Sequence, residues 1–129
     1  MTKKVIVAGV GMIPFKKPGA SENYNVMGEK AARAALEDAG LDYKLVQQAY
    51  VGYVYGDSTA GQAALYGVGL SGIPIFNVNN YCSTGSSALF LARQAVQSGT
   101  IDCAIALGFE QMTPGCLLYT SPSPRDSSE

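Results

Sequence analysis

The chain has 129 residues and a formal net charge of −1, from nine basic and ten acidic side chains. This length suits one domain, or one part of a larger one. Hydrophobic residues make up 47% of the chain and charged residues only 15%, against a typical charged share of about 25%. We therefore expect the chain to bury much of its surface, against itself or against a partner. The near-neutral charge, without a basic stripe, argues against nucleic acid and anionic lipid as partners.

The chain contains no histidine, and this excludes several kinds of active site. Neither a Ser-His-Asp nor a Cys-His arrangement can form within it, and neither can a zinc site of the Cys₂His₂ or His₃ type. The cysteines, Cys82, Cys103 and Cys116, include no CxxC pair, so we expect no metal site. An odd number of cysteines without a secretory signal indicates free thiols in a reducing compartment.

Strand-like and helix-like segments alternate along the chain. The first, residues 5–10, is apolar on both faces and predicts a buried parallel strand. It is not a signal peptide, because Gly9, Gly11 and Pro14 would break a helical core. Further strands are predicted at residues 49–55, 74–79 and 103–109, and helices at residues 24–39, 61–68 and 83–98. This order indicates an α/β fold with a largely parallel sheet, and no apolar run is long enough for a transmembrane segment.

The predicted helix at residues 83–98 carries a single charge, Arg93. Apolar side chains spread around most of its circumference, which is typical of a helix that is buried on nearly every side. One small sheet cannot cover such a helix fully. We therefore expect it to lie in the middle of a larger layered structure.

The C-terminal segment differs in character from the rest of the chain. From residue 117 on, it is rich in Ser and Pro and has neither a helical nor a strand period. We predict a partial domain over residues 1–115, followed by a disordered tail over residues 116–129. The abrupt change also predicts that the tail is foreign to the native sequence.

The segment around Cys82 is the strongest candidate site. A predicted strand ends at Asn79 and a predicted helix begins at about Ser83, which places Cys82 at the helix N-terminus. The positive end of the helix dipole and unpaired backbone N–H groups both stabilise a thiolate there, and small residues at 83–86 let a ligand approach the sulfur. The alternative is that Cys82 is a small buried hydrophobe, and the residues alone leave both interpretations open. Cys103 lies in an apolar strand, which disfavours its thiolate, and is predicted to be a core residue.

Five stretches of sequence carry a family pattern: VAGVGM at residues 7–12, YVGYVYGDST at 50–59, GIP at 72–74, NVNNYCSTGSSALF at 77–90 and ALGFEQM at 106–112. Together they resemble the N-terminal part of thiolases, and most closely the peroxisomal 3-oxoacyl-CoA thiolases of the sterol carrier protein 2/X type. The resemblance runs from Lys3 to about Gly115, and the stretch around Cys82 is its most specific part.

The resemblance implies a thiolase-like α/β fold with α/β/α/β/α layers, of which this chain holds only the N-terminal sheet and its helices. It implies that Cys82 is the catalytic nucleophile, which takes an acyl group as a thioester and passes it to coenzyme A. Acyl-CoA and coenzyme A are then substrates; no other cofactor is implied, and no residue of this chain is assigned to binding them.

The resemblance also implies a homodimer, with the strand before Cys82 near the two-fold axis, and a peroxisomal location of the parent protein. The C-terminus, residues 127–129, is no Ser-Lys-Leu-like signal. The helix after Cys82 would lie between the two sheets of the complete subunit.

The chain lacks the later part of the family pattern. The family's two histidines, its oxyanion-hole asparagine, its second cysteine and its coenzyme-A loop all follow the matching region, and Cys116 does not stand in for the second cysteine. We therefore expect acyl-CoA acyltransferase activity, the thiolysis of 3-oxoacyl-CoA in β-oxidation, from the parent protein and no turnover from this chain. Three alternatives stay open: a ketoacyl-synthase-like condensing enzyme, lipid or sterol transfer through a C-terminal sterol-carrier domain, and a non-catalytic dimerisation module.

Overall fold

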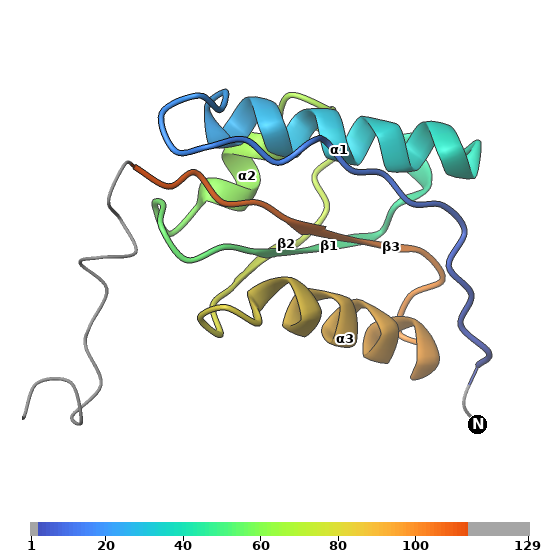
Figure 1. Ribbon diagram of the computed structural model, residues 1–129. Helices are drawn as coiled ribbons and strands as arrows, with labels where there is room; N and C mark the ends of the chain where they lie inside the picture. The colour runs from blue at the N-terminus through green and yellow to red at the C-terminus, as the bar shows by residue number, and fades with distance from the viewer. Residues whose placement is uncertain (1–2, 114–129) are drawn as a thin grey trace, which may run out of the picture.

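The computed structural model describes residues 3–113, which form one parallel sheet between two layers of helices (Figure 1). The sheet has three strands in the order β2-β1-β3. Helices α1 and α2 lie on one face of it and α3 lies on the other (Figure 1). In chain order the elements are α1 (Tyr24–Ala39), the 3₁₀ helix η1 (Tyr43–Leu45), β1 (Gln48–Gly52), α2 (Ala60–Leu65), β2 (Ile75–Val78), α3 (Thr84–Gln97) and β3 (Ala104–Gly108). The predicted α/β fold with a parallel sheet is confirmed.

Helix α1 has the bounds that the sequence predicts. It ends at Gly40, whose φ of 67° lies in the left-handed region that favours glycine, and the Gly40 N–H donates to the carbonyl of Glu37. Small residues let α1 approach its neighbours closely. A Cβ on Gly28 would lie 2.8 Å from the Cβ of Ala64, so a larger residue there would push α1 away from α2.

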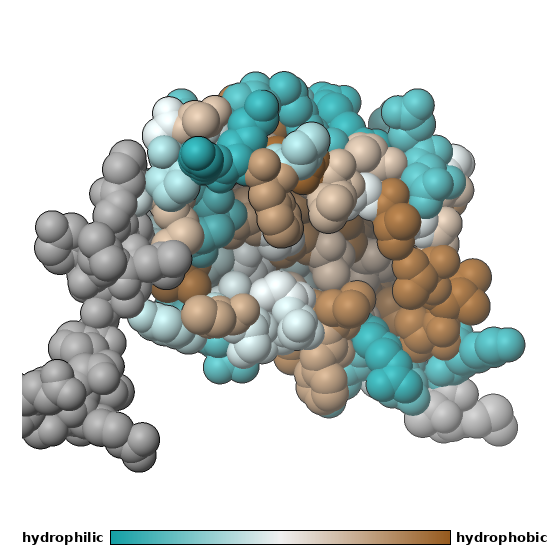
Figure 2. Space-filling model, in the orientation of Figure 1, coloured by the Kyte–Doolittle hydropathy of each residue, from teal (hydrophilic) through white to brown (hydrophobic). Residues whose placement is uncertain are grey.

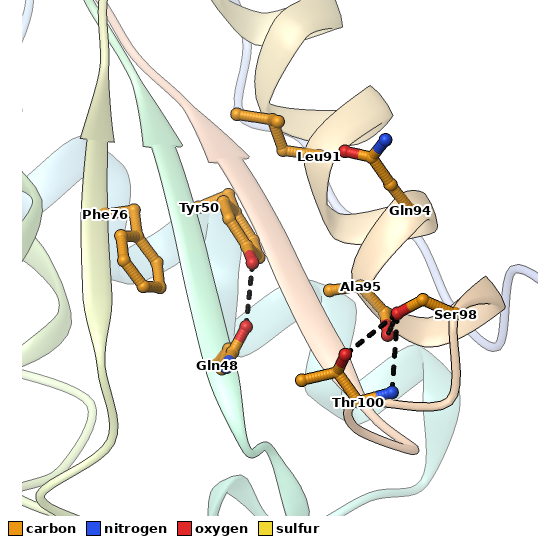
Figure 3. A pocket seen from close by; sticks show the side chains of 8 residues that line it. All are labelled: Gln48, Tyr50, Phe76, Leu91, Gln94, Ala95, Ser98 and Thr100. Carbon is orange, nitrogen blue, oxygen red and sulfur yellow. Dashed lines mark hydrogen bonds between the residues drawn. The ribbon is translucent and has the colours of Figure 1, made fainter.

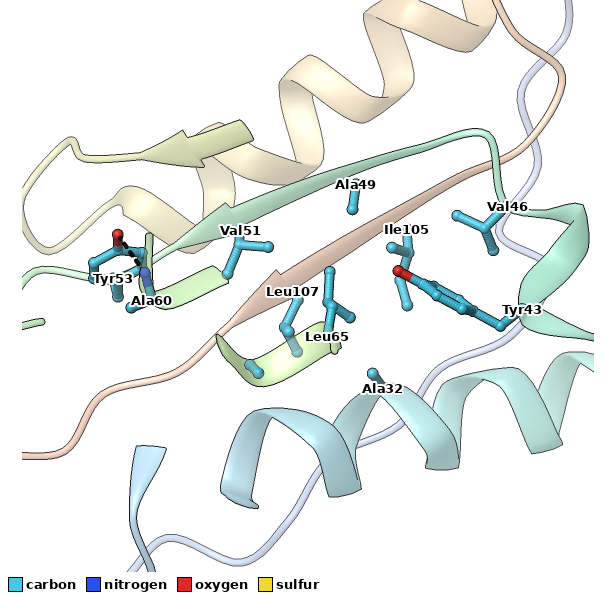
Figure 4. Packing of buried hydrophobic residues seen from close by; sticks show 11 residues of the cluster. Ala32, Tyr43, Val46, Ala49, Val51, Tyr53, Ala60, Leu65, Ile105 and Leu107 are labelled. Atoms are coloured by element: carbon cyan, nitrogen blue, oxygen red, sulfur yellow. Dashed lines mark hydrogen bonds between the residues drawn. The ribbon is translucent and has the colours of Figure 1, made fainter. Parts of the chain in front are cut away.

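One face of the sheet forms the hydrophobic core. Ala49 of β1 pairs with Ile105 of β3, and Val51 pairs with Leu107. All four side chains are buried beneath α1 and α2, together with Leu65 of α2 (Figure 4). Because successive residues of a strand point to opposite faces, these alternate positions share one side of the sheet. Their burial removes apolar area from water, which stabilises the described part of the chain.

Helix α3 covers the other face of the sheet with small side chains. Thr84, Ala88 and Ala92 recur every four residues, lie on one side of the helix, and are buried. By contrast, Leu89 and Phe90 are 57% and 60% exposed. The expectation that one small sheet cannot cover this helix is therefore confirmed. The side of α3 that faces away from the strands is open among residues 3–113.

The N-terminal segment is the main departure from the sequence predictions. Residues 5–10 are not a strand but extended chain outside the sheet. Ile6, Val7 and Val10 are 73%, 74% and 68% exposed. Figure 2 shows apolar surface at the right of the view, where this segment crosses the molecule. The prediction of a buried parallel strand at residues 5–10 was wrong.

Two glycines explain where the N-terminal segment lies. A Cβ on Gly9 would be 2.5 Å from the backbone nitrogen of Ala39, and a Cβ on Gly11 would be 2.4 Å from that of Ala35. The segment therefore packs directly on the backbone of α1, and the Val10 N–H donates to the carboxylate of Asp38 at 2.8 Å. The β-branched residues produce a strand-like pattern, but the glycines between them fit the segment to a helix surface instead.

None of the helices within residues 3–113 combines the length and the apolar character that a bilayer crossing needs. The predicted domain boundary at residue 115 and the predicted tail at residues 116–129 lie outside the described residues. Both stay predictions.

Candidate active site at Cys82

All three strands end at one edge of the sheet, and Cys82 lies in the turn that leaves this edge. Gly52 of β1 is paired with Val78 of β2 and with Gly108 of β3, so the strands end in register. The sequence predicted that the second strand runs to residue 55, but β1 ends at Gly52 and leaves residues 53–59 as a loop. In parallel α/β sheets, ligands bind outside the carboxyl ends of the strands. Cys82 lies at this edge.

Two asparagines hold the turn from β2 to α3. Asn79 Oδ1 accepts the N–H of Tyr81 at 3.1 Å, and Asn80 Nδ2 donates to Ser87 Oγ at 2.9 Å. The Asn80 carbonyl accepts both the N–H and the hydroxyl of Ser83, at 3.1 and 2.8 Å. Tyr81 has a φ of 50°, the only positive value at a non-glycine residue within residues 3–113. Such strained backbone persists only where its surroundings hold it, and it is common at functional sites.

Cys82 carries an exposed free thiol. Helix α3 begins at Thr84 with Ser83 as its N-cap residue, so Cys82 lies just before the first turn and not within it. This position is close to the positive end of the helix dipole, as the sequence predicted. The alternative interpretation, a small buried hydrophobe, is wrong because the residue is exposed. A ligand that approaches the carboxyl edge can therefore reach the sulfur.

The first turn of α3 rests directly on β1. A Cβ on Gly52 would lie 2.4 Å from the carbonyl oxygen of Thr84 and 3.0 Å from the nitrogen of Gly85, which is closer than real side chains come to backbone. A Cβ on the paired Gly108 would lie 3.6 Å from the Gly85 Cα, an ordinary contact. Gly52 is therefore the residue whose missing side chain permits this close approach. Gly52 therefore determines the distance between the sheet and the start of α3, directly after the Cys82 turn.

The residues after β3 tie the ends of several elements together. The ring of Phe109 is stacked between those of Tyr24 and Tyr53, with centroid distances of 5.4 and 5.2 Å. The Phe109 N–H donates to the carbonyl of Gly52 at 3.2 Å. Gln111 Oε1 accepts the N–H of Tyr24 at 2.8 Å, at the start of α1. The segment is thus fixed to α1 on one side and to β1 on the other.

Glu110 lies in the middle of this segment and binds the loop after β1. Its Oε1 accepts the N–H of Val54 at 2.8 Å, and its Oε2 accepts the N–H of Tyr55 at 3.0 Å. Sequence reasoning did not single out Glu110. The one signal that could have found it is its place in the stretch at residues 106–112, where an acidic side chain follows an apolar strand.

A hydrogen-bonded cluster fixes the loop between β1 and α2. The Tyr53 hydroxyl donates to the carbonyl of Asp57 at 2.5 Å and accepts the N–H of Ala60 at 3.3 Å. Asn77 Oδ1 accepts the N–H of Gly61 at 2.7 Å. Burial raises the pKa of Tyr53, so its hydroxyl stays protonated and able to donate at neutral pH. The loop therefore has a defined conformation beside the Cys82 turn.

Cys103 has a different environment from Cys82. It packs against the core, and burial raises the pKa of its thiol. The prediction of a disfavoured thiolate is confirmed, but Cys103 is only partly buried and lies just before β3, so it borders the core and is not part of it. Cys116 lies outside the described residues. Within residues 3–113, no three His, Cys, Asp or Glu side chains come together in a way that could hold a metal ion.

A groove of about 450 Å³ runs between α3 and the uncovered part of the sheet (Figure 3). Its lining residues come from β1, β2, α3 and the turn after α3: Gln48, Tyr50, Phe76, Leu91, Gln94, Ala95, Ser98 and Thr100. Most of them belong to the first half of β1 or the last turns of α3, whereas Cys82 lies before the first turn. The groove is therefore about 13–20 Å from Cys82 along the helix axis, at about 1.5 Å per residue.

A family model that matches most of the chain shows which protein family it belongs to. A family model described as "Thiolase, N-terminal domain" matches residues 5–122. The chain belongs to the thiolase family. It is 56% identical over 119 residues to sterol carrier protein 2 of Gallus gallus, and this alignment covers 91% of the chain and 22% of that protein. It is 37% identical over 115 residues to the benzoylsuccinyl-CoA thiolase subunit BbsB of Thauera aromatica, covering 88% of the chain and 29% of that protein.

A solved structure shares the fold of this thiolase-family chain. The acetyl-CoA acetyltransferase of Syntrophomonas wolfei superposes with a TM-score of 0.72 at 26% identity, over 81% of the chain and 28% of that structure. The predicted thiolase-like fold is thereby confirmed. The chain spans about a fifth of the length of the sterol carrier protein 2 relatives that it matches. The role of Cys82 as nucleophile stays a prediction.

Proposed function

We propose that this chain supplies the acyl-accepting cysteine of an acyl-CoA acyltransferase of the thiolase kind. In the proposed reaction the Cys82 thiolate attacks the 3-oxo carbonyl carbon of a 3-oxoacyl-CoA. The bond between C2 and C3 breaks, and acetyl-CoA leaves as an enolate that takes up a proton. The thiol of coenzyme A then attacks the Cys82 thioester and releases the shortened acyl-CoA, with its proton passing to a base.

One observation carries this proposal: the exposed thiol of Cys82 lies in a strained turn at the carboxyl edge of a thiolase-family sheet. Exposure allows a thioester to reach the sulfur. The sulfur lies beside the positive end of α3, whose first turn begins two residues later. Gly85 and the small side chains around it leave space for the substrate.

The chain has no histidine, so no imidazole of this chain can serve as the base in either step. General acid–base catalysis is typically worth about 10²- to 10⁴-fold in rate. We therefore propose that this chain becomes acylated on Cys82 but does not turn over by itself. Thiolysis belongs to a protein that also supplies these groups.

Acylation of Cys82 can be tested directly. We expect peptide mapping by mass spectrometry to find the acyl group on Cys82 after incubation with acetyl-CoA. Cys82→Ala should lose the adduct, and Cys103→Ala should keep it. An adduct on Cys103 in the folded chain, or no adduct on any cysteine, would contradict the proposal.

Lipid transfer is a second candidate, favoured by the name of the sterol carrier protein 2 relatives. The chain matches only the thiolase-like N-terminal 22% of those proteins. We therefore propose that any carrier activity belongs to a part of the relatives that this chain does not align with. Transfer of a fluorescent sterol between vesicles should be no faster with this chain than without it. To distinguish a condensing activity from thiolysis, the acylated protein is given a malonyl thioester in place of coenzyme A. Transfer of the acyl group to the malonyl thioester would indicate condensation.

We propose that the parent protein is a peroxisomal homodimer that pairs along the outer edge of β2. Within residues 3–113, β2 pairs only with β1, so its other edge is available to a second copy. The family resemblance supports both proposals. Sedimentation of the parent protein should give a dimer, and a fluorescent fusion of it should colocalise with a peroxisomal marker. A monomer, or a diffuse signal, would contradict the corresponding proposal.

A further inference from the structure

Glu110 makes a two-point contact across the carboxyl edge of the sheet. Each of its carboxylate oxygens accepts one backbone N–H, from Val54 at 2.8 Å and from Tyr55 at 3.0 Å. These two donors are adjacent in the chain and lie 56 and 55 positions before Glu110. A carboxylate that accepts backbone N–H groups makes charge-assisted bonds, which are stronger than neutral ones.

The backbone of Glu110 is itself held in place by its neighbours. Phe109 donates its N–H to the Gly52 carbonyl, and its ring lies between two tyrosine rings. Gln111 bonds the first N–H of α1. Because both neighbours are fixed, the Glu110 carboxylate has a defined position relative to the backbone N–H groups of residues 54–55.

The two residues that precede the pair bound by Glu110, Gly52 and Tyr53, contact the two ends of the Cys82 turn. Tyr53 donates its N–H to the carbonyl of Val78, the last residue of β2, at 3.4 Å. Gly52 lies against the carbonyl oxygen of Thr84, the first residue of α3. The chain therefore enters and leaves the Cys82 turn in contact with residues 52–53, which directly precede the residues that Glu110 anchors.

We propose that Glu110 is a positioning residue: by anchoring residues 54–55 just after β1, it holds residues 52–53 in place and so fixes the Cys82 turn against the sheet. This inference rests on the proposed function, because it concerns the placement of the thiol that would accept the acyl group. Glu110 acts through Val54, Tyr55 and Gly52 and does not itself contact the sulfur in this arrangement.

A carboxylate is suited to this position and a carboxamide is not. Glutamine has one oxygen acceptor, and its NH₂ group would face the second N–H donor. Aspartate keeps both acceptor oxygens but is one methylene shorter. Glu110→Gln therefore breaks the two-point contact, whereas Glu110→Asp preserves its chemistry at shorter reach.

The experiment measures iodoacetamide labelling of Cys82 in the 129-residue chain between pH 6 and pH 9, with peptide mapping. Labelling of Cys103 in the same samples reports any general loosening of the fold. Glu37→Gln, an exposed carboxylate on α1, is the matched control. Gly52→Ala, which moves the Thr84 backbone directly, is the positive control for a displaced turn.

We expect Glu110→Gln to slow labelling of Cys82 at pH 7 by about 3- to 10-fold, and to shift its pH profile in the direction that Gly52→Ala does. Glu110→Asp should recover part of this loss. Cys103 labelling and the Glu37→Gln profile should not change. Unchanged or faster Cys82 labelling in Glu110→Gln would overturn the proposal, even if the melting temperature falls.

If Glu110→Gln unfolds the chain, which faster labelling of Cys103 would report, the Glu110→Asp variant tests the proposal. A pH profile of Cys82 that differs from wild type, with Cys103 still protected, supports positioning; an identical profile overturns it. The proposed function fails separately, when wild-type Cys82 accepts no acyl group. The inference about Glu110 fails when wild type is acylated and labelled as expected but the Glu110 variants behave identically.

Discussion

The two faces of the sheet are covered to different extents. Beneath α1 and α2, Val51 and Leu65 are fully buried and Leu107 is 6% exposed. On the α3 face, Phe76 of β2 is 45% exposed and Phe90 of the helix is 60% exposed. The closed face therefore supplies stability, while the open face carries the Cys82 turn and leaves apolar surface available for association.

The largest expected effect tests whether the closed face carries the stability. Leu65→Ala should lower the free energy of unfolding by about 2–5 kcal/mol, because it removes a fully buried side chain and leaves a cavity. Leu89→Ala, the same substitution on the open side of α3, should stay within about 0.5 kcal/mol. Urea unfolding followed by circular dichroism measures both. Equal losses for the two variants would show that the faces contribute alike.

A second pair of variants separates the two strands beneath the Cys82 turn. Gly52→Ala should destabilise the chain by about 1–3 kcal/mol, because its Cβ would collide with the backbone of α3. Gly108→Ala adds the same atom on the paired strand, where it meets only ordinary contacts. Melting temperatures compare the two. The interpretation of Gly52 is wrong if Gly108→Ala is the more harmful substitution.

Association should depend on the open face. We expect the chain to self-associate, and Phe90→Glu should weaken this about tenfold, or about 1.4 kcal/mol, by placing a charge on the exposed apolar side of α3. Gln94→Glu adds the same charge to the same helix without removing an apolar ring. Analytical ultracentrifugation over a concentration series gives the comparison. A wild-type chain that stays monomeric at all concentrations contradicts this prediction.

The smallest effect concerns a thiol on the closed side. Burial raises the pKa of Cys103 above its ordinary value of 9.0, so the native state holds this proton more tightly than the unfolded state does. The resulting stability is present below pH 9 and is lost as the pH rises through the folded value. Between pH 8 and pH 10, the melting temperature of wild type should therefore fall more steeply than that of Cys103→Val. Parallel declines would mean that Cys103 does not contribute.

Local patterns in the sequence predicted most of the fold. The alanine-rich stripe of α1 and its stop at Gly40 are local signals, and the helix has the predicted bounds. Residues 5–10 show where such signals fail. Their β-branched residues are typical of a strand, but Gly9 and Gly11 place the segment on α1, and that fit depends on residues more than 20 positions away.

The candidate site could be predicted only where its signals are local in the sequence. Cys82 could be found because the end of a strand, the cysteine and the start of a helix are adjacent in the chain. Its exposure could not be predicted, since that depends on what the rest of the fold places over it. Glu110 was missed because its partners are the backbone N–H groups of distant residues, and backbone groups leave no mark on the sequence.

The strand order has a consequence for how this chain is made. The central strand β1 has no partner close to it in sequence: Gln48 pairs with Ala104, 56 positions later. A ribosome adds about 5–20 residues per second, so β1 waits roughly 3–11 s before β3 is synthesised. During that time its apolar side chains lack a neighbouring strand on that edge. Nascent chains of this protein should therefore depend on chaperones until β3 emerges.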